Sequence, residues 1–208
     1  MDIYLRNDTM EQPSERVLGL ARQRGVLRLS DVTASGIHPE YVRRLVGDGR
    51  LVRDGRGLYR LPDADVTEHH SLVEAARRVP GGVVCLLSAL SFHQIGTQLP
   101  YQVWLAINVK ARCPRVDHPP LRIVRFSGAA LFSGIEQHSI EGVDVRVYSV
   151  AKTIADCFKY RNKTGLDVAL EALREGWRER RFAMEEIQVY ASVCRVANVM
   201  RPYLESLP

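Results

Sequence analysis

The chain has 208 residues, of which 46% are hydrophobic and 25% charged, and its net charge is +5. This composition is typical of a globular protein, and the length allows one large domain or two small ones. No apolar run approaches the ~18 residues of a membrane span, and residues 1–12 are too polar for a secretion signal, so we expect a cytoplasmic protein with no membrane partner. Met1 and Met10 are both candidate start residues.

The first third of the chain predicts a compact arrangement of helices and one hairpin. Ser14 is the expected N-cap of a helix that Gly25 ends, and Ser30 is the expected N-cap of a second, short helix. Asp54-Gly55 begins a tight turn, because this dipeptide favours primed hairpin turns. Helices are expected over residues 14–24, 31–34 and 39–48, and strands over residues 50–53 and 58–61. This order is typical of a winged helix-turn-helix, and a polar linker ends the domain at residue 65.

Positive charge is concentrated in the same segment. Between Ser14 and Pro62 there are ten arginines and five acidic residues, a surplus that equals the net charge of the whole chain. Arginine forms two parallel hydrogen bonds to phosphate or guanine, which lysine does not. Winged helices also serve as protein-docking modules, but the arginine distribution favours double-stranded operator DNA as the partner.

The expected DNA-reading helix is the one that begins near Pro39. In helix-turn-helix proteins this helix enters the major groove, and its early residues contact base edges. Arg43 and Arg44 are about 100° apart on it, so we expect one to face a base and the other a phosphate. Tyr41 suits the core and the DNA equally, and Ser30 suits a phosphate contact as well as its N-cap role. The full set of expected DNA-binding residues is Arg28, Ser30, His38, Tyr41, Arg43, Arg44, Arg53, Arg56 and Arg60.

Residues 66–208 predict a mixed α/β domain with a helical C-terminus, which makes the whole chain an α+β protein. Leu72 begins a helix that ends at Pro80, and the apolar run over residues 83–92 is expected to be a buried helix. Ser149 is the expected N-cap of the first of the C-terminal helices. Strands are expected over residues 102–109, 121–126, 137–140 and 143–148, and the C-terminal helices over residues 150–159, 164–178, 184–192 and 196–204.

The second domain contains no recognisable catalytic motif. The sequence lacks a phosphate-binding loop, the H-E-x-x-H and G-x-S-x-G motifs, and the protein kinase signatures. The six histidines are scattered and the four cysteines form no C-x-x-C pair, so we expect no metal, no cofactor and no disulfide framework. Cys85, Cys157 and Cys194 lie in apolar runs and are expected to be buried thiols. Ser88 and His93 are expected to have packing roles.

Three residues of the C-terminal part are candidates for a partner contact. Lys152 and Asp156 are four residues apart, hence on one helical face, where we expect an exposed ion pair. With Lys159 they form a polar patch that a protein partner, or a phosphate-bearing ligand, could occupy.

Several runs together resemble the AbiEi family of antitoxins from type IV toxin–antitoxin pairs. They are the pattern over residues 26–61, which ends in Gly-Leu-Tyr-Arg, followed by VCLLSALSFH at residues 84–93, VWLAI at residues 103–107 and VYSVAKTIADC at residues 147–157. The resemblance implies a repressor that binds the promoter of its own operon through the winged helix. It also implies that the second domain neutralises a nucleotidyltransferase-like toxin, for which Lys152, Asp156 and Lys159 are the candidate residues.

Two alternatives remain open at this point. The first is an enzyme-type antitoxin that modifies its toxin covalently, for instance an atypical serine/threonine protein kinase that uses ATP. The second is a stand-alone transcription factor with no toxin partner. The mass of the toxin after incubation with ATP and this protein discriminates the first alternative, and the adjacent gene discriminates the second.

Overall fold

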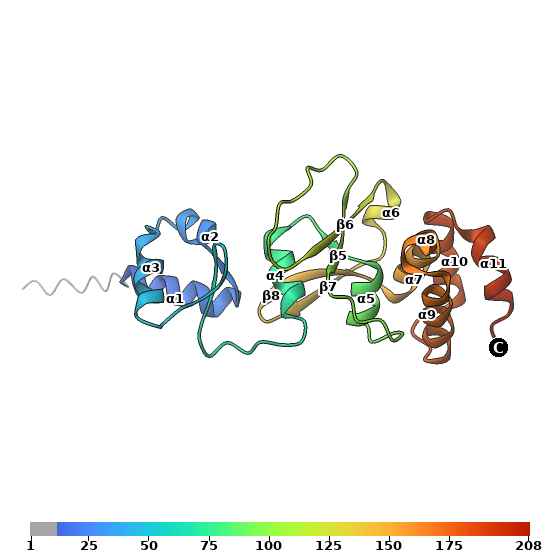
Figure 1. The fold of residues 1–208 in the computed structure, drawn as a ribbon, viewed down its shortest axis with the longest axis horizontal. Coiled ribbons are helices and arrows are strands. Elements are labelled where there is room, and N and C mark those ends of the chain that lie inside the picture. Colours follow the sequence, from blue (N-terminus) through green and yellow to red (C-terminus); the bar gives the residue numbers. More distant parts are fainter. Residues whose placement is uncertain (1–11) are drawn as a thin grey trace, which may run out of the picture. The chain divides into compact units, whose positions relative to one another are not determined.

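The computed structural model describes residues 12–208, which form two compact units that meet between residues 66 and 67 of the chain (Figure 1). The boundary expected from the sequence, after residue 65, lies one residue away. Helices and strands mix in an α+β fold that begins with helices and ends with a helical C-terminal part, as expected. The choice between Met1 and Met10 as start residue lies outside the described residues. No helix within residues 12–208 is long and apolar enough to cross a membrane.

The first unit contains three helices and a small antiparallel sheet. The sheet has the strand order β1-β3-β2. Apolar side chains of all three helices form the core of the first unit, among them Leu18, Val32 and Leu45. The elements are α1 (Pro13–Arg24), β1 (Leu27–Arg28), α2 (Leu29–Ala34), α3 (Glu40–Gly47), β2 (Val52–Gly55) and β3 (Leu58–Arg60).

The two helix starts in this unit differ from the expected ones. Pro13 occupies the first turn of α1, where its missing N–H costs no hydrogen bond, so Ser14 lies inside the helix and is not its N-cap. Ser30 likewise lies in the first turn of α2, because Arg28 holds the N-cap position and donates its backbone N–H to the Asp31 carboxylate at 3.2 Å. Gly25 ends α1 in a left-handed conformation, φ 62°, as expected.

The hairpin turn is shorter than expected, because β2 continues to Gly55 and the turn consists of residues 56–57, whereas the sequence predicts a turn over residues 54–57. The register pairs Arg53 with Tyr59 and then Gly55 with Leu58, so Asp54 is an extra residue in β2 and the turn falls after Gly55. At this bulge the Asp54 carboxylate accepts a hydrogen bond from Arg60 Nε at 2.8 Å, which links β2 to β3.

The second unit is built on a five-stranded mixed sheet of order β6-β5-β4-β8-β7. The β4–β8 and β5–β6 pairs are parallel, and the β4–β5 and β7–β8 pairs are antiparallel. The strands are β4 (Val83–Val84), β5 (Val103–Asn108), β6 (Leu121–Phe126), β7 (Ile135–Ile140) and β8 (Val143–Tyr148). The helices are α4 (His70–Arg78), α5 (Leu86–Phe92), α6 (Ala129–Phe132), α7 (Val150–Lys159), α8 (Arg161–Thr164), α9 (Leu166–Arg178), α10 (Met184–Val193) and α11 (Ala197–Glu205).

Most of these elements match the expected ranges, and one does not. The run over residues 83–92 begins as a strand, because Val84 pairs with Val147 in the middle of the sheet, and the helix starts only at Leu86. The two four-residue helices α6 and α8 were not expected. Cys85, Cys157 and Cys194 are buried, as expected, whereas Cys113 is exposed.

Helix α7 occupies the centre of the second unit. Ser149 caps it, since its side chain accepts the backbone N–H of Lys152 at 3.4 Å, as expected. All nine residues from Val150 to Phe158 are buried, because α5, α9, α10 and α11 pack around the helix.

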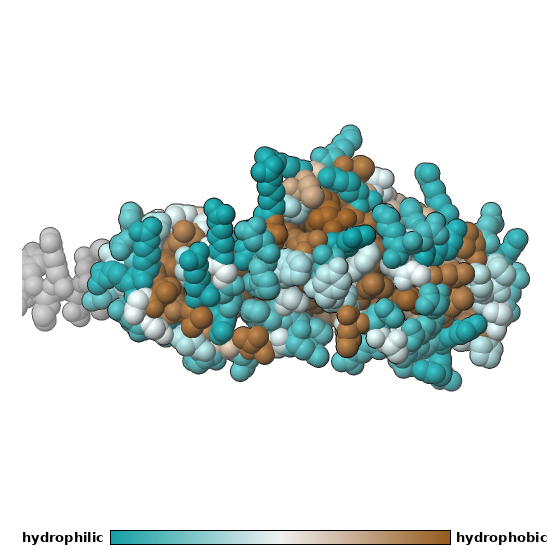
Figure 2. Space-filling model, viewed as in Figure 1, coloured by the Kyte–Doolittle hydropathy of each residue, from teal (hydrophilic) through white to brown (hydrophobic). Residues whose placement is uncertain are grey.

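In Figure 2, hydrophilic residues project from the visible face of each unit, with apolar residues between them.

Candidate nucleic-acid interface and a buried ion pair

Helix α3 separates an apolar face from a charged one. Val42 and Leu45 are buried against the core of the first unit, whereas Arg43 and Arg44 are exposed. Arg43 Nη1 lies 3.3 Å from Glu40 Oε2, and both side chains are mostly exposed. Such a surface pair contributes at most about 1 kcal/mol, so a phosphate or a guanine can replace Glu40 at little cost.

Two neighbours of these arginines support the helix. The Tyr41 ring is partly buried against the core, and the Arg44 guanidinium lies 5.9 Å from its centroid. His38 is exposed, and its Nδ1 accepts the backbone N–H of Glu40 at 3.2 Å. Tyr41 therefore packs against the core beside Arg44, and the His38 ring accepts a hydrogen bond just before the first turn of α3.

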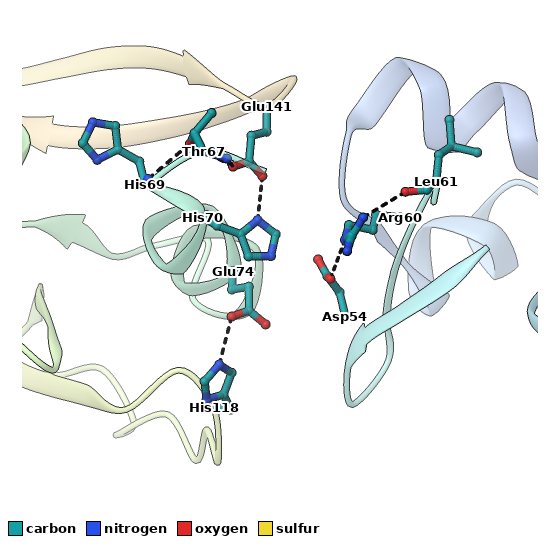
Figure 3. Close-up of polar contacts among 9 residues, drawn as sticks. All are labelled: Asp54, Arg60, Leu61, Thr67, His69, His70, Glu74, His118 and Glu141. Carbon is teal, nitrogen blue, oxygen red and sulfur yellow. Dashed lines mark hydrogen bonds and ion pairs between the residues drawn. The ribbon is translucent and has the colours of Figure 1, made fainter. Parts of the chain in front are cut away.

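The hairpin distributes its arginines between two roles. Arg53 and Arg56 are exposed, and Arg53 Nε donates to the carbonyl of Gly55 at 3.2 Å. Arg60 is partly buried and bonds to Asp54 at 2.8 Å and to the carbonyl of Leu61 at 3.1 Å (Figure 3). Arg60 therefore ties the two strands together, whereas Arg53 and Arg56 are presented to solvent.

The remaining arginines show how much of the positive charge holds the fold. Arg50 bonds to Glu15 at 2.8 Å, and Arg24 to Asp31 at 3.3 Å. Arg28 is partly buried at the start of α2, and Ser30 is exposed in its first turn. Some arginines of the first unit thus form ion pairs that hold the fold, and others, among them Arg44, Arg53 and Arg56, face solvent.

The Lys152–Asp156 pair is buried, so the expectation of an exposed pair is wrong. Lys152 Nζ lies 2.5 Å from Asp156 Oδ2, and the two side chains are 0% and 1% exposed. Lys152 Nζ also lies 4.1 Å and 4.9 Å from the ring centroids of Tyr148 and Phe126. The physical reason is that α7 has neighbours on every side, so a polar pair on one of its faces points into the protein.

The electrostatics of this pair follow from its burial. Burial raises the pKa of the Asp156 carboxyl above its usual range, and the Lys152 charge opposes that rise. Asp156 Oδ1 also accepts a hydrogen bond from Cys194 Sγ at 3.1 Å. Lys152 and Asp156 cannot contact a protein partner, whereas Lys159, at the end of the same helix, is exposed.

A second polar cluster ties the start of the second unit to the β7–β8 turn. Glu141 Oε1 accepts the backbone N–H and the hydroxyl of Thr67 at 2.7 and 2.9 Å, and Glu141 Oε2 lies 2.6 Å from His70 Nδ1 (Figure 3). His118 Nε2 lies 3.4 Å from Glu74 in the same view. Sequence reasoning missed Glu141, which was visible only as part of a hairpin turn.

The polar residues expected to have packing roles do have them. Ser88 Oγ accepts the backbone N–H of Trp104 at 2.9 Å, and His93 Nε2 lies 2.8 Å from the carbonyl oxygen of Tyr148. Within residues 12–208, no three His, Cys, Asp or Glu side chains gather in a way that could hold a metal ion.

Comparisons with known proteins give one family match, which lies in the first unit. Residues 15–62 match the family described as "Transcriptional regulator, AbiEi antitoxin". The match confirms the resemblance to AbiEi antitoxins for this segment, which is less than half of the chain. No curated protein matches the chain.

The whole chain is similar in structure to the RV2827C protein from Mycobacterium tuberculosis, known from a crystal structure. The TM-score is 0.61 at 16% sequence identity, over 94% of this chain and 78% of that one. At this identity the likeness establishes a shared fold, which spans both units.

Proposed function

We propose that this chain is a repressor whose first unit is a winged helix-turn-helix that binds operator DNA. One observation carries the proposal: α3 presents Arg43 and Arg44 on the face opposite its buried Val42 and Leu45, in the segment that matches a family of transcriptional regulators. A helix anchored by one face and cationic on the other suits insertion into the major groove.

The hairpin supplies the second half of the interface. In this proposal β2, β3 and their turn are the wing, and Arg53 and Arg56 contact the DNA backbone. Ser30 donates to a phosphate from the first turn of α2, next to Arg28. His38, Tyr41 and Arg60 act indirectly, because their contacts hold α3 and the wing in shape.

Binding measurements on an operator duplex and on a scrambled duplex test this interface. We expect Arg43→Ala or Arg44→Ala to cost ~1–3 kcal/mol on the operator and much less on a scrambled duplex, since a base contact is lost. Arg56→Ala should weaken both complexes alike and reduce the salt slope by about one unit, as for a phosphate contact. Arg201→Ala, an exposed arginine of α11, is the matched control for the lost charge.

Fluorescence anisotropy over a salt series gives both the binding affinity for each duplex and the dependence of that affinity on salt. Equal losses on operator and scrambled duplex for Arg43, Arg44 and Arg56 variants would reject α3 as the base-reading helix. Unchanged binding in all three would reject the whole interface.

We further propose that the chain represses its own operon and that its second unit neutralises a nucleotidyltransferase-like toxin. Support comes from the family match in the first unit and from the separate hydrophobic core of the second. Of the three candidate residues for the toxin contact, Lys159 is the exposed one. Growth rescue of cells that express the toxin tests neutralisation, with Lys159→Ala against Lys163→Ala as the matched pair.

The mass of the rescued toxin separates binding from modification. An unchanged mass supports neutralisation by a complex. A gain of one phosphate, dependent on ATP and produced with turnover, would replace this proposal with an enzyme-type antitoxin.

A further inference from the structure

A small polar pocket in the second unit has no role in the DNA-binding proposal. Its volume is about 350 Å³, and it lies between the end of β6, the loop into α6, the end of α7 and the turn after α10. Lys159 from α7 and Arg195 from the turn line it, and so does Arg125 from β6, whose guanidinium is bonded to backbone carbonyls at the end of β5 and in the loop that follows. Lys159 and Arg195, which are distant in the sequence, thus bring two positive charges to one concave place.

The charge of the pocket is not compensated from within the protein. Arg125, Lys159 and Arg195 are exposed, and none of them has an ion pair with another residue of the described range 12–208. Asp156 is the one acidic side chain among the described residues that line the pocket, and Lys152 already balances its charge at 2.5 Å. An anion that enters the pocket therefore meets a surplus of positive charge.

Arg125 is held in place before any ligand binds. Its Nη1 donates to the carbonyl oxygens of Val109 and Ala111 at 2.9 and 2.8 Å, and lies 3.4 Å from that of Asn108. The Tyr160 hydroxyl donates to the backbone carbonyl of Arg125 at 3.3 Å. The carbonyls of Asn108, Val109 and Ala111 belong to residues that do not line the pocket, so Arg125 contributes a fixed backbone to the pocket wall.

Arg195 occupies a backbone position that normally favours glycine. Its φ is 58°, directly after the C-cap of α10, where helices commonly end in a left-handed glycine. An arginine at this position costs conformational energy, and its side chain is delivered to the pocket.

We propose that this pocket binds the terminal phosphate group of a small ligand, either free phosphate or pyrophosphate or the phosphate end of a nucleotide. Guanidinium groups pair with phosphate oxygens through two hydrogen bonds, and lysine adds a point charge. A concave site of this size takes a terminal phosphate group and excludes the body of a duplex. The site is separate from the operator-binding residues, which all belong to the first unit.

Calorimetric titration of the full chain tests the site, with pyrophosphate and ATP as probes and adenosine as the phosphate-free control. Because a hydrogen bond to a charged group is worth about tenfold or more in affinity, Lys159→Ala should raise the Kd of the tighter probe by at least that factor. Arg201→Ala removes one exposed positive charge from α11, none of whose residues lines the pocket, and should change the Kd less than about twofold.

Arg195→Gly separates binding from folding. Glycine adopts the left-handed conformation freely, so this variant should melt no lower than the wild type and still lose about tenfold in affinity. Pyrophosphate binding without ATP binding would identify a free anion, and tighter binding of ATP would identify a nucleotide. The proposal is overturned if the wild type shows no saturable binding of either probe below about 10 mM, or if Arg201→Ala weakens binding as much as Lys159→Ala.

Discussion

Replacing Lys152 with methionine tests the ion pair at the centre of the second unit. Methionine keeps most of the length and volume of the side chain and removes its charge. Asp156 then stays buried without the partner that lies 2.5 Å from it. Removing one member of a buried pair costs ~3–5 kcal/mol, a large part of the ~5–15 kcal/mol by which a typical domain is stable. We therefore expect the second unit to be severely destabilised at neutral pH.

The size of the loss should depend on pH in a defined direction. Burial raises the pKa of Asp156 and Lys152 opposes the rise, so the variant raises that pKa further. A carboxyl group whose folded pKa exceeds its unfolded value, about 3.9 for aspartate, stabilises the fold below the unfolded pKa. That stabilisation disappears as the pH rises through the folded pKa. The free energy of unfolding of the variant should therefore be closest to that of the wild type near about pH 4, and the difference should grow towards neutral pH.

Tryptophan fluorescence measures this effect in the second unit alone, because both tryptophans of the chain, Trp104 and Trp177, belong to it. Urea unfolding is followed at acidic and neutral pH for the wild type, Lys152→Met and the double variant Lys152→Met with Asp156→Leu. Apolar replacement of a whole buried pair is often neutral or stabilising, so the double variant should recover most of the loss. A stable single variant at neutral pH, or a double variant as unstable as the single one, would refute the reasoning.

Three further changes have defined outcomes. A Cβ on Gly134, whose φ is +72°, would lie 2.7 Å from Lys152 Cβ. Gly134→Ala should therefore lower the free energy of unfolding by about 2–4 kcal/mol in the same urea assay. An unchanged unfolding midpoint would contradict this prediction. Burial acts to raise the pKa of Glu141, but hydrogen bonds from His70 and Thr67 outweigh it and lower the pKa. The lowered pKa of Glu141 stabilises the fold above the unfolded pKa, and this stabilisation is lost as the pH falls through the folded pKa. Glu141→Gln should therefore lower the free energy of unfolding at neutral pH and lower it less in acid. A loss that does not depend on pH would contradict this prediction. Removal of residues 1–65 should abolish operator binding and leave the tryptophan unfolding curve unchanged, and residual specific binding would contradict the assignment of DNA binding to the first unit.

Local patterns were sufficient for much of the fold. The strands over residues 121–126 and 143–148 have the predicted bounds, and α7 begins after Ser149 as predicted. Alternating apolar residues bounded by turn residues identify such elements without knowledge of their neighbours. The two-residue strand β4 could not be found in this way, because Val83 and Val84 open an apolar run that suits a buried helix equally well. Only the pairing of Val84 with Val147, distant in the sequence, makes it a strand.

The candidate interface shows the same limit at the level of side chains. The exposure of Arg43 and Arg44 follows from the helical spacing of Val42 and Leu45, so the sequence predicts it correctly. The pairing of Arg60 with Asp54 depends on a bulge in the hairpin, which no local pattern indicates. Charge counting therefore located the basic domain but could not separate the arginines that hold it together from those that face solvent.

The burial of the Lys152–Asp156 pair changes how a loss of toxin neutralisation should be interpreted. On an amphipathic helix, a lysine and an aspartate four residues apart mark the solvent face, but α7 is enclosed by other helices and has no such face at these positions. Replacing both residues with alanine would leave a void in the core, so failed rescue by that variant would follow from unfolding alone. Lys159 lies on the same helix and is exposed, so its replacement leaves the core intact. A loss of rescue by Lys159→Ala with an unchanged unfolding curve would therefore be evidence that this end of α7 acts on the toxin.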